Sequence, residues 1–315
     1  MDPMTRSLFM AAARKKPPVI VAGAPSNYIV RSEDGVNWSA VYNSGSSGQY
    51  IQQIIWAGGM FVAVSYGGGI ITSPDGTNWT QRIGGNFYSV AYGNGMFIAM
   101  GEVYYSSPDG ITWTSRNLST LTGTQGPDFV TAVAFNGNTW VCMGVTGATS
   151  RPYTKTGSPI SGGWTAQATL TGTDNFGRMK YTAGAYYMLR QSSSGVLYRS
   201  TNDGVNFSNA GISTASNCGA DWAYNGSLWA AVGTNGTTPQ LKTSSDISAS
   251  WTTVNTSFFT SAAIAAVEWV PGLDLWIIGG TDGLMAYSPD GINWTLGSVT
   301  GLGTRAIQAI AYGYI

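Results

Sequence analysis

The sequence predicts an all-β protein, a seven-bladed β-propeller whose blades are four-stranded antiparallel sheets. A phrase of the form Ser-x-Asp-Gly-x-x-Trp returns at intervals of about 40 residues, which is the length of one propeller blade. The two ends of the chain are complementary, because Pro18–Gly23 resembles the second strand of a repeat and Arg305–Tyr312 the first. We therefore expect the C-terminal strand to complete the N-terminal blade, so that residues 18–315 form one closed ring without an open seam.

Each recurring phrase predicts a tight turn between the third and fourth strands (C and D) of a blade. An Asp side chain accepts hydrogen bonds from amides further along the turn, Gly supplies a positive φ, and Ser bonds locally. The aromatic residue that opens the next strand offers a large apolar body to bury. The residues assigned to these structural turns are Ser32, Asp34, Trp38, Ser73, Asp75, Trp79, Ser107, Asp109, Trp113, Asp203, Phe207, Asp246, Trp251, Ser288, Asp290 and Trp294.

Taken in order, the repeats account for almost the whole chain. Alternating apolar runs joined by Asn-Gly-type turns predict the A–B hairpin that precedes each Asp turn. Blade four departs from the pattern, with a long connection before it at Leu118–Pro127 and an enlarged C–D turn at Thr156–Gly163. The predicted segments are Val19–Gly23, Tyr28–Ser32 and Asn37–Tyr42 for strands B, C and D of blade one, then Tyr50–Ile83, Phe87–Asn117, Phe129–Thr165, Asn175–Asn209, Asn217–Asn255 and Ala262–Val299 for blades two to seven.

The turn phrase resembles the Asp-box (BNR) motif of sialidase-like propellers, with one residue fewer between Asp and Gly. In that family the motif lies at the C–D turn, away from the ligand face, and it recurs in glycosidases, sorting receptors, photosystem assembly factors and phage proteins. The resemblance covers about residues 18–315 and implies architecture far more than function. The low-charge, Gly/Ser/Thr/Asn-rich composition most resembles noncatalytic propellers encoded by bacteriophages.

The topology of a propeller divides the connections between two faces. The D–A and B–C connections share one face, and the A–B and C–D turns share the other. The resemblance implies that a ligand binds on the first of these, where loops also carry function more often than strands. The candidate ligand-binding residues on that face are Tyr50, Glu102, Asp128, Phe129, Asp174, Phe176, Arg178, Asp282 and Arg305.

A catalytic role is the less favoured interpretation. The sialidase resemblance implies three arginines, a Tyr nucleophile backed by Glu, and an acid Asp, but the Arg-Ile-Pro motif that supplies one arginine is absent. Glu102, Asp128 and Asp174 on consecutive blades could form the carboxylate pair of another glycosidase, which needs a separation of about 5–5.5 Å or about 6.5–9.5 Å. Solvated loop carboxylates are the simpler interpretation. We expect a noncatalytic protein without a cofactor or a metal.

Composition excludes several classes of function. Charged residues make up 10% of the chain and the formal net charge is zero, which argues against a nucleic-acid partner. The sequence has no apolar run of about 18 residues, so no membrane insertion is expected. It has no His, the commonest general base and transition-metal ligand. Cys142 and Cys218 fall on strands that are not neighbours, which predicts free thiols rather than a disulfide.

Residues 1–17 lie outside the repeat and combine apolar with basic side chains. Three interpretations of the segment are open: a disordered tail, a docking arm that becomes ordered on a partner, or a targeting sequence. The candidate docking residues are Arg6, Leu8, Phe9, Arg14, Lys15 and Lys16. Together with the resemblance to phage proteins, the docking arm predicts a virion component (tail, fibre or head decoration) that is made in the host cytoplasm. Such a protein would dock on other virion proteins and act in assembly or host-surface attachment. A host-surface glycan is then a candidate ligand. A secreted glycan-binding lectin and a glycoside hydrolase are the alternatives.

Overall fold

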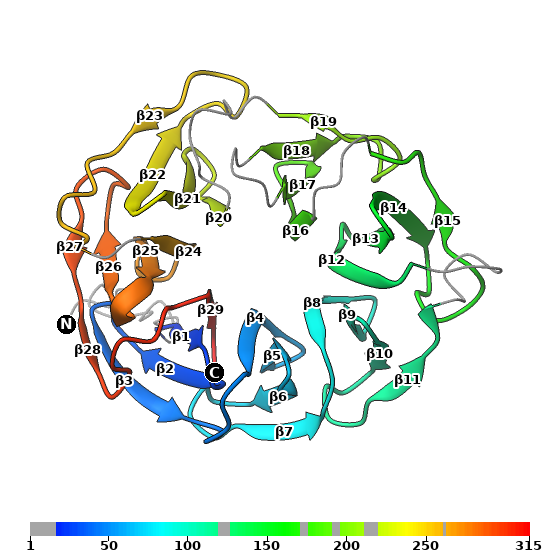
Figure 1. Cartoon of the computed structure of the whole chain (residues 1–315), viewed down its shortest axis with the longest axis horizontal. Helices are drawn as coiled ribbons and strands as arrows, with labels where there is room; N and C mark the ends of the chain where they lie inside the picture. Colours follow the sequence, from blue (N-terminus) through cyan, green and yellow to red (C-terminus); the bar gives the residue numbers. More distant parts are fainter. Residues whose placement is uncertain (1–16, 119–126, 171–175, 191–195, 211–219, 261–262) are drawn as a thin grey trace, which may run out of the picture.

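The computed structural model describes residues 17–118, 127–170, 176–190, 196–210, 220–260 and 263–315. The fold is all-β, with seven sheets arranged as the blades of a ring (Figure 1). The predicted seven-bladed propeller is therefore confirmed. The proposed arm, Asp174, Cys218 and most of the Leu118–Pro127 connection lie outside the described residues.

Blades two to seven each consist of four consecutive strands in the order A-B-C-D, with strand A innermost (Figure 1). Blade two comprises β4 (Tyr50–Ala57), β5 (Met60–Tyr66), β6 (Gly69–Ser73) and β7 (Thr80–Ile83). The next two are β8 (Phe87–Gly93), β9 (Met96–Gly101), β10 (Tyr104–Ser107) and β11 (Thr114–Arg116), then β12 (Phe129–Phe135), β13 (Thr139–Thr146), β14 (Thr149–Thr156) and β15 (Thr165–Ala166). Blade five comprises β16 (Phe176–Thr182), β17 (Ala185–Arg190), β18 (Leu197–Ser200) and β19 (Ser208–Asn209).

The last two of these blades continue the same pattern. Blade six comprises β20 (Asp221–Tyr224), β21 (Trp229–Asn235), β22 (Thr238–Ser244) and β23 (Thr252–Thr253). Blade seven comprises β24 (Ile264–Val270), β25 (Leu275–Gly280), β26 (Met285–Ser288) and β27 (Thr295–Leu296), with the 3-10 turn η4 (Thr281–Gly283) between β25 and β26.

Blade one closes the ring with strands from both ends of the chain. Its sheet contains β1 (Val19–Ala24), β2 (Tyr28–Ser32), β3 (Asn37–Tyr42) and the C-terminal β29 (Ala309–Gly313). β29 pairs antiparallel with β1 from Val19 opposite Gly313 to Gly23 opposite Ala309, which confirms the predicted closure. The strand begins later than the predicted Arg305, because the Ile307 amide donates to Gly280 O of blade seven instead of pairing with β1. The Arg305 guanidinium stacks on the Tyr28 ring at 3.9 Å.

A second closing contact was not predicted. Residues assigned to the end of blade seven form β28 (Ser298–Thr300), which pairs parallel with β3 at the outer edge of blade one. The chain passes between the two blades at Gly297, whose amide donates to Met285 O while the Ser298 amide donates to Val36 O. Blade one thus has five strands and is held to the C-terminal segment along both of its edges.

Aromatic pairs mark the A–B end of blades two to seven. In each pair the two residues are direct cross-strand partners, and their ring centroids lie between 4.3 and 5.2 Å apart. Such pairs stabilise an antiparallel sheet by roughly 0.2–1 kcal/mol each. They are Trp56–Phe61, Tyr92–Phe97, Phe135–Trp140, Tyr181–Tyr186, Tyr224–Trp229 and Trp269–Trp276.

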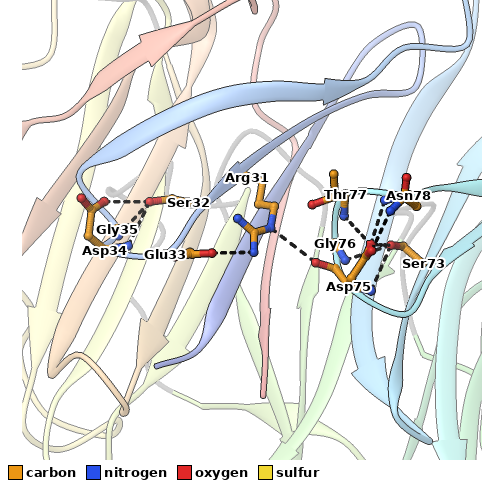
Figure 2. A network of polar contacts seen from close by, with 10 residues as sticks. All are labelled: Arg31, Ser32, Glu33, Asp34, Gly35, Ser73, Asp75, Gly76, Thr77 and Asn78. Carbon is orange, nitrogen blue, oxygen red and sulfur yellow. Dashed lines mark hydrogen bonds and ion pairs between the residues drawn. The ribbon is translucent and has the colours of Figure 1, made fainter. Parts of the chain in front are cut away.

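The Asp turns have the predicted chemistry in blades one, two, three and seven (Figure 2 shows the first two). The Ser Oγ donates to the Asp Oδ1 over 2.9–3.0 Å and accepts from the Gly amide over 2.8–2.9 Å. The same Oδ1 accepts two further amides, and the Trp Nε1 donates to the Gly carbonyl over 3.0–3.2 Å. Burial alone would raise the pKa of Asp34 and Asp75, but these donors lower it to about 2.

Blades four, five and six depart from that turn. In blade five Asn202, not the predicted Asp203, accepts from Ser200 Oγ and from the Asn206 amide. Asp203 is the extra residue that the other copies lack; it takes a φ of +56° and accepts from Asn136. In blade six Asp246 accepts from the Ser248 amide, while Ser244 Oγ donates to main-chain oxygens. In blade four Trp164 is buried and donates to Pro159 O.

Candidate functional site

Hydrogen bonds between loops define the two faces of the disc. Asn86, in the connection before blade three, accepts from the Gly67 amide in a B–C turn and donates to Glu102 in the next one. Asp128 likewise accepts from the Gly147 amide. We call this side the D–A face. The Asp turns lie on the opposite side, the A–B face, where Asp203 meets Asn136 of an A–B turn.

Five innermost strands contain a β-bulge near the D–A face. The pairing register shifts by one residue there, and the extra residues are Gln52, Tyr88, Thr131, Arg178 and Ala265. A bulge bends its strand and re-aims the unpaired side chain. All five extra residues line one cavity of about 450 Å³ on the ring axis, which we call the upper cavity. Its other lining residues are Ile51, Phe129, Phe176, Gly177, Ala220 and Gln308.

Arg178 forms the boundary between the upper cavity and a second one. It lies in a bulge with a φ of +47°, and its guanidinium reaches Asp221 Oδ2 of blade six at 3.1 Å. The same group donates to the Gln308 carbonyl of blade one, on the far side of the axis. Beyond it lies the lower cavity, of about 460 Å³, near the A–B face. Arg178 is the one lining residue that both cavities share among those described.

Four charged side chains meet at this boundary; we call Arg178, Lys180, Asp221 and Glu268 the charged cluster. Lys180 Nζ lies 3.6 Å from Asp221 and 3.7 Å from Glu268, and donates to Trp222 O over 2.8 Å. The Asp221 side chain is 3% exposed and also accepts the Trp222 and Val267 amides. The cluster thus joins the innermost strands of blades five, six and seven.

Aromatic rings lead across the D–A face into the upper cavity. Tyr66 is 40% exposed and stacks on Tyr88 with centroids 6.0 Å apart, and Tyr88 lies 5.9 Å from Phe129. We call these three residues the aromatic row. Glu102 accepts from the Tyr88 hydroxyl and holds that ring in place. Burial and the Glu102 charge raise the pKa of Tyr88 to about 12, so the hydroxyl stays a donor at neutral pH.

The structure brings together only some of the sequence-predicted ligand residues. Phe129, Phe176 and Arg178 line the upper cavity, although Phe176 is 2% exposed and packs edge-on against Tyr198. Tyr50 is 41% exposed and is the cross-strand partner of Tyr66, beside the aromatic row. Glu102 also borders this row.

Two other predicted residues lie away from the upper cavity. Asp282 belongs to η4, with a φ of +59°. Arg305 is held by Tyr28 and the Leu302 carbonyl.

The sequence did not predict several residues of the site. Lys180, Asp221 and Glu268 lie inside innermost strands, whose sequence pattern does not mark them as site residues. Tyr66, Tyr88, Gln52 and Thr131 were also not singled out. A signal for Asp221 exists, since the corresponding position after the bulge is Ala132 in blade four and Ala266 in blade seven. The same position is Gln53 in blade two, Ser89 in blade three and Met179 in blade five, so Asp221 is the one charged residue among these six described positions. A charge there points to an interaction between blades.

Arg178 is the one charged residue among the described residues that line the upper cavity. No described residue that lines the upper cavity is a carboxylate, and Asp128 and Glu102 are engaged with loop donors outside it. The described residues contain no group of three or more Asp, Glu or Cys side chains that could hold a metal ion. Nor does any helix in these ranges have the length and apolarity to cross a membrane. Cys142 is buried, and burial raises the pKa of its thiol.

Neither a protein-family model nor a curated protein matches the sequence. Solved propellers do match the fold. The structure of YCF48 bound to D1 peptide is 16% identical over 83% of this chain and 85% of its own, with a TM-score of 0.58. A putative 6-phosphogluconolactonase from Bacteroides fragilis is 9% identical over 96% and 99%, with a TM-score of 0.60. The WD40 propeller of Doa1 is 13% identical over 83% and 86%, with a TM-score of 0.53. At these identities the likeness concerns the fold alone.

Proposed function

We propose that this protein is a noncatalytic binding propeller that holds its ligand on the D–A face, in the upper cavity and along the aromatic row. One observation carries the proposal: all seven blades contribute lining residues to the upper cavity, from Gln308 of blade one to Ala265 of blade seven. Because every blade contributes to the site, the closed ring as a whole holds its lining residues in position. A rigid concave site of this size suits a small ligand or the terminal group of a larger one.

A neutral glycan is the ligand that the lining favours. Gln52, Thr131 and Gln308 offer amide and hydroxyl groups, and Tyr88 and Phe129 offer ring faces. Gln308 Oε1 is buried without a hydrogen-bond partner among the described residues, and rotation of this side chain into the cavity would let it accept a ligand hydroxyl. The Arg178 charge is already matched by Asp221, which disfavours an anionic sugar as the preferred ligand.

The proposed biological setting is a bacteriophage virion, where the propeller would act in assembly or host-surface attachment. The support is compositional: 43 Gly residues, 10% charged residues and a neutral formal charge, together with the basic and apolar segment that precedes the ring. A secreted lectin would use the same cavity. Mass spectrometry of purified particles separates these two settings, because only a virion component copurifies with the particle at a constant ratio.

A glycan array with the purified protein tests the ligand. Tyr66→Ala removes an exposed ring of the aromatic row and should weaken binding about tenfold, as expected for the loss of about 1.4 kcal/mol, whereas Tyr66→Phe should retain it. Tyr181→Ala is the matched control, since Tyr181 is 39% exposed but lies beside an A–B turn. Equal loss in Tyr66→Ala and Tyr181→Ala would contradict a D–A site. Release of free sugar from the bound glycans would contradict a noncatalytic role.

A further inference from the structure

The lower cavity is a second candidate site, independent of the function proposed for the D–A face. It opens beside the A–B turns, where Tyr314 at its edge is 41% exposed. Trp56, Tyr312 and Tyr314 supply aromatic surface, and Ile55 and Ile310 supply aliphatic surface. The charged cluster lines the inner end. The cavity therefore combines apolar walls with a polar inner end, which is the usual arrangement of a small-molecule site.

Two members of the charged cluster remain accessible from this cavity. The side chains of Lys180 and Glu268 are 30% and 24% exposed, whereas those of Arg178 and Asp221 are 19% and 3% exposed. Their contact is also loose. Lys180 Nζ lies 3.7 Å from Glu268 Oε2, whereas a direct charge-assisted hydrogen bond measures about 2.7–2.9 Å.

Glu268 has acceptor capacity to spare. Among the described residues its Oε1 accepts a single hydrogen bond, from the Trp269 amide at 3.3 Å. Burial raises the pKa of Glu268 and opposes its ionisation, while the neighbouring Lys180 lowers it. Burial and the Glu268 charge also raise the pKa of Tyr312 to about 12, which keeps this ring beside the carboxylate neutral. A donor that approached Glu268 from the cavity would therefore meet an incompletely hydrogen-bonded carboxylate.

The charge count decides which ligand fits. Arg178 and Lys180 balance Asp221 and Glu268, so the cluster is neutral when all four groups are ionised. A purely cationic or purely anionic ligand would add an unmatched charge to a half-buried site, which is unfavourable. A zwitterion adds no net charge and can supply an ammonium to Glu268 and a carboxylate to Lys180 at the same time.

We propose that the lower cavity binds a small zwitterion with an apolar body, such as a free aromatic or aliphatic α-amino acid. In an α-amino acid the ammonium and carboxylate are attached to one carbon, so their charges are adjacent, like those of Lys180 and Glu268. The apolar side chain then packs against Trp56 and Tyr312. This use of the A–B side of the ring leaves the upper cavity free for its own ligand.

Titration calorimetry at neutral pH with three related probes tests the proposal. L-phenylalanine is a zwitterion, phenethylamine lacks the carboxylate, and N-acetyl-L-phenylalanine lacks the ammonium. We expect saturable binding of L-phenylalanine at millimolar concentration or below, with the other two probes at least about tenfold weaker. Absence of saturable L-phenylalanine binding, or equal binding of all three probes, would overturn the proposal.

Two charge variants sharpen the test. Glu268→Gln leaves the cluster with an excess positive charge and should shift the preference to N-acetyl-L-phenylalanine. Lys180→Met leaves an excess negative charge and should shift it to phenethylamine. Unchanged preference in folded variants would overturn the proposal. If a variant fails to fold, NMR of the native protein replaces it, with the Trp56 indole N–H resonance identified by its loss in Trp56→Phe. The chemical shift of this resonance should change when L-phenylalanine is added. An unchanged chemical shift would contradict binding in this cavity.

Discussion

Arg178 Nη1 lies 3.1 Å from Asp221 Oδ2, and this ion pair joins blade five to blade six at the axis of the ring. The Asp221 carboxylate also accepts two main-chain amides, one of them from Val267 in blade seven. The equivalent role in other blades belongs to uncharged groups: Gln53 Oε1 accepts the Val90 amide, and Ser89 Oγ accepts the Val133 amide. A polar residue at this position of the innermost strand therefore links each of these blades to the next.

The first prediction concerns Asp221. Asp221→Ala removes the partner of two cations and two amides in a buried position and should lower the free energy of unfolding by about 3–5 kcal/mol. Urea denaturation provides the measurement. Asp128→Asn is the control, because Asp128 is exposed and accepts one loop amide, and it should change stability by about 1 kcal/mol or less. Equal effects in the two variants would mean that the ion pair at the axis contributes no more than a surface contact.

The second prediction concerns ring closure. Deletion of Thr304–Ile315 removes β29 and leaves β1 as an open edge on the inner side of blade one, facing the ring axis. Loss of this ladder should cost several kcal/mol, comparable to the whole stability of an ordinary domain. Thermal unfolding should then occur at a much lower temperature, with aggregation through the open edge. An unchanged melting temperature would show that β28 suffices to hold blade one.

The third prediction separates two neighbouring residues of the blade-five turn. Asn202→Ala removes the acceptor for Ser200 Oγ and the Asn206 amide and should lower stability by about 1 kcal/mol. Asp203→Gly should have little effect, because Gly favours the positive φ that Asp203 adopts and this offsets the loss of the exposed contact with Asn136. A larger loss in Asp203→Gly than in Asn202→Ala would restore Asp203 as the residue that organises this turn.

The fourth prediction concerns acid. The folded-state pKa of Asp34 and Asp75 is about 2, below the ordinary value of 3.8, so ionisation of both side chains stabilises the folded state at neutral pH. This contribution is complete above the unfolded pKa and is lost as the pH falls from about 4 to about 2. The Asp34→Asn and Asp75→Asn double variant should be less stable at pH 7, with a smaller further loss between pH 4 and pH 2. Parallel pH profiles of the two proteins would contradict the assignment.

The fifth prediction concerns residues 1–16, whose Arg6, Arg14, Lys15 and Lys16 make the segment positive within a neutral chain. Because the described sheets contain none of these residues, their deletion should leave the melting temperature unchanged. In a virion component it should abolish incorporation, since a short apolar and basic segment can order on a partner surface. Normal incorporation of the truncated protein into particles would assign anchoring to the propeller instead.

The sequence by itself determined the repeating unit and its number. The Asp turns are local structures: Ser73, Asp75 and Gly76 lie within four consecutive residues, so their hydrogen bonds follow from residue type and spacing. The bounds of blades two and three, predicted as Tyr50–Ile83 and Phe87–Asn117, followed to within one residue for the same reason, because hairpins with tight turns set their own register. Closure was also predictable, since Arg305–Tyr312 and Pro18–Gly23 each lacked a neighbour that the other supplied.

The tertiary structure alone decided what surrounds the axis. Three features join segments that are distant in sequence. They are the gathering of the bulge residues around the upper cavity, the parallel pairing of β28 with β3, and the meeting of Arg178, Lys180, Asp221 and Glu268. A strand pattern with period two reports which face of its own blade a side chain occupies, but it carries no information about the strand across the ring. Both candidate sites lie on the ring axis, where the closure of the ring, and not the pattern of any single repeat, brings side chains of different blades together.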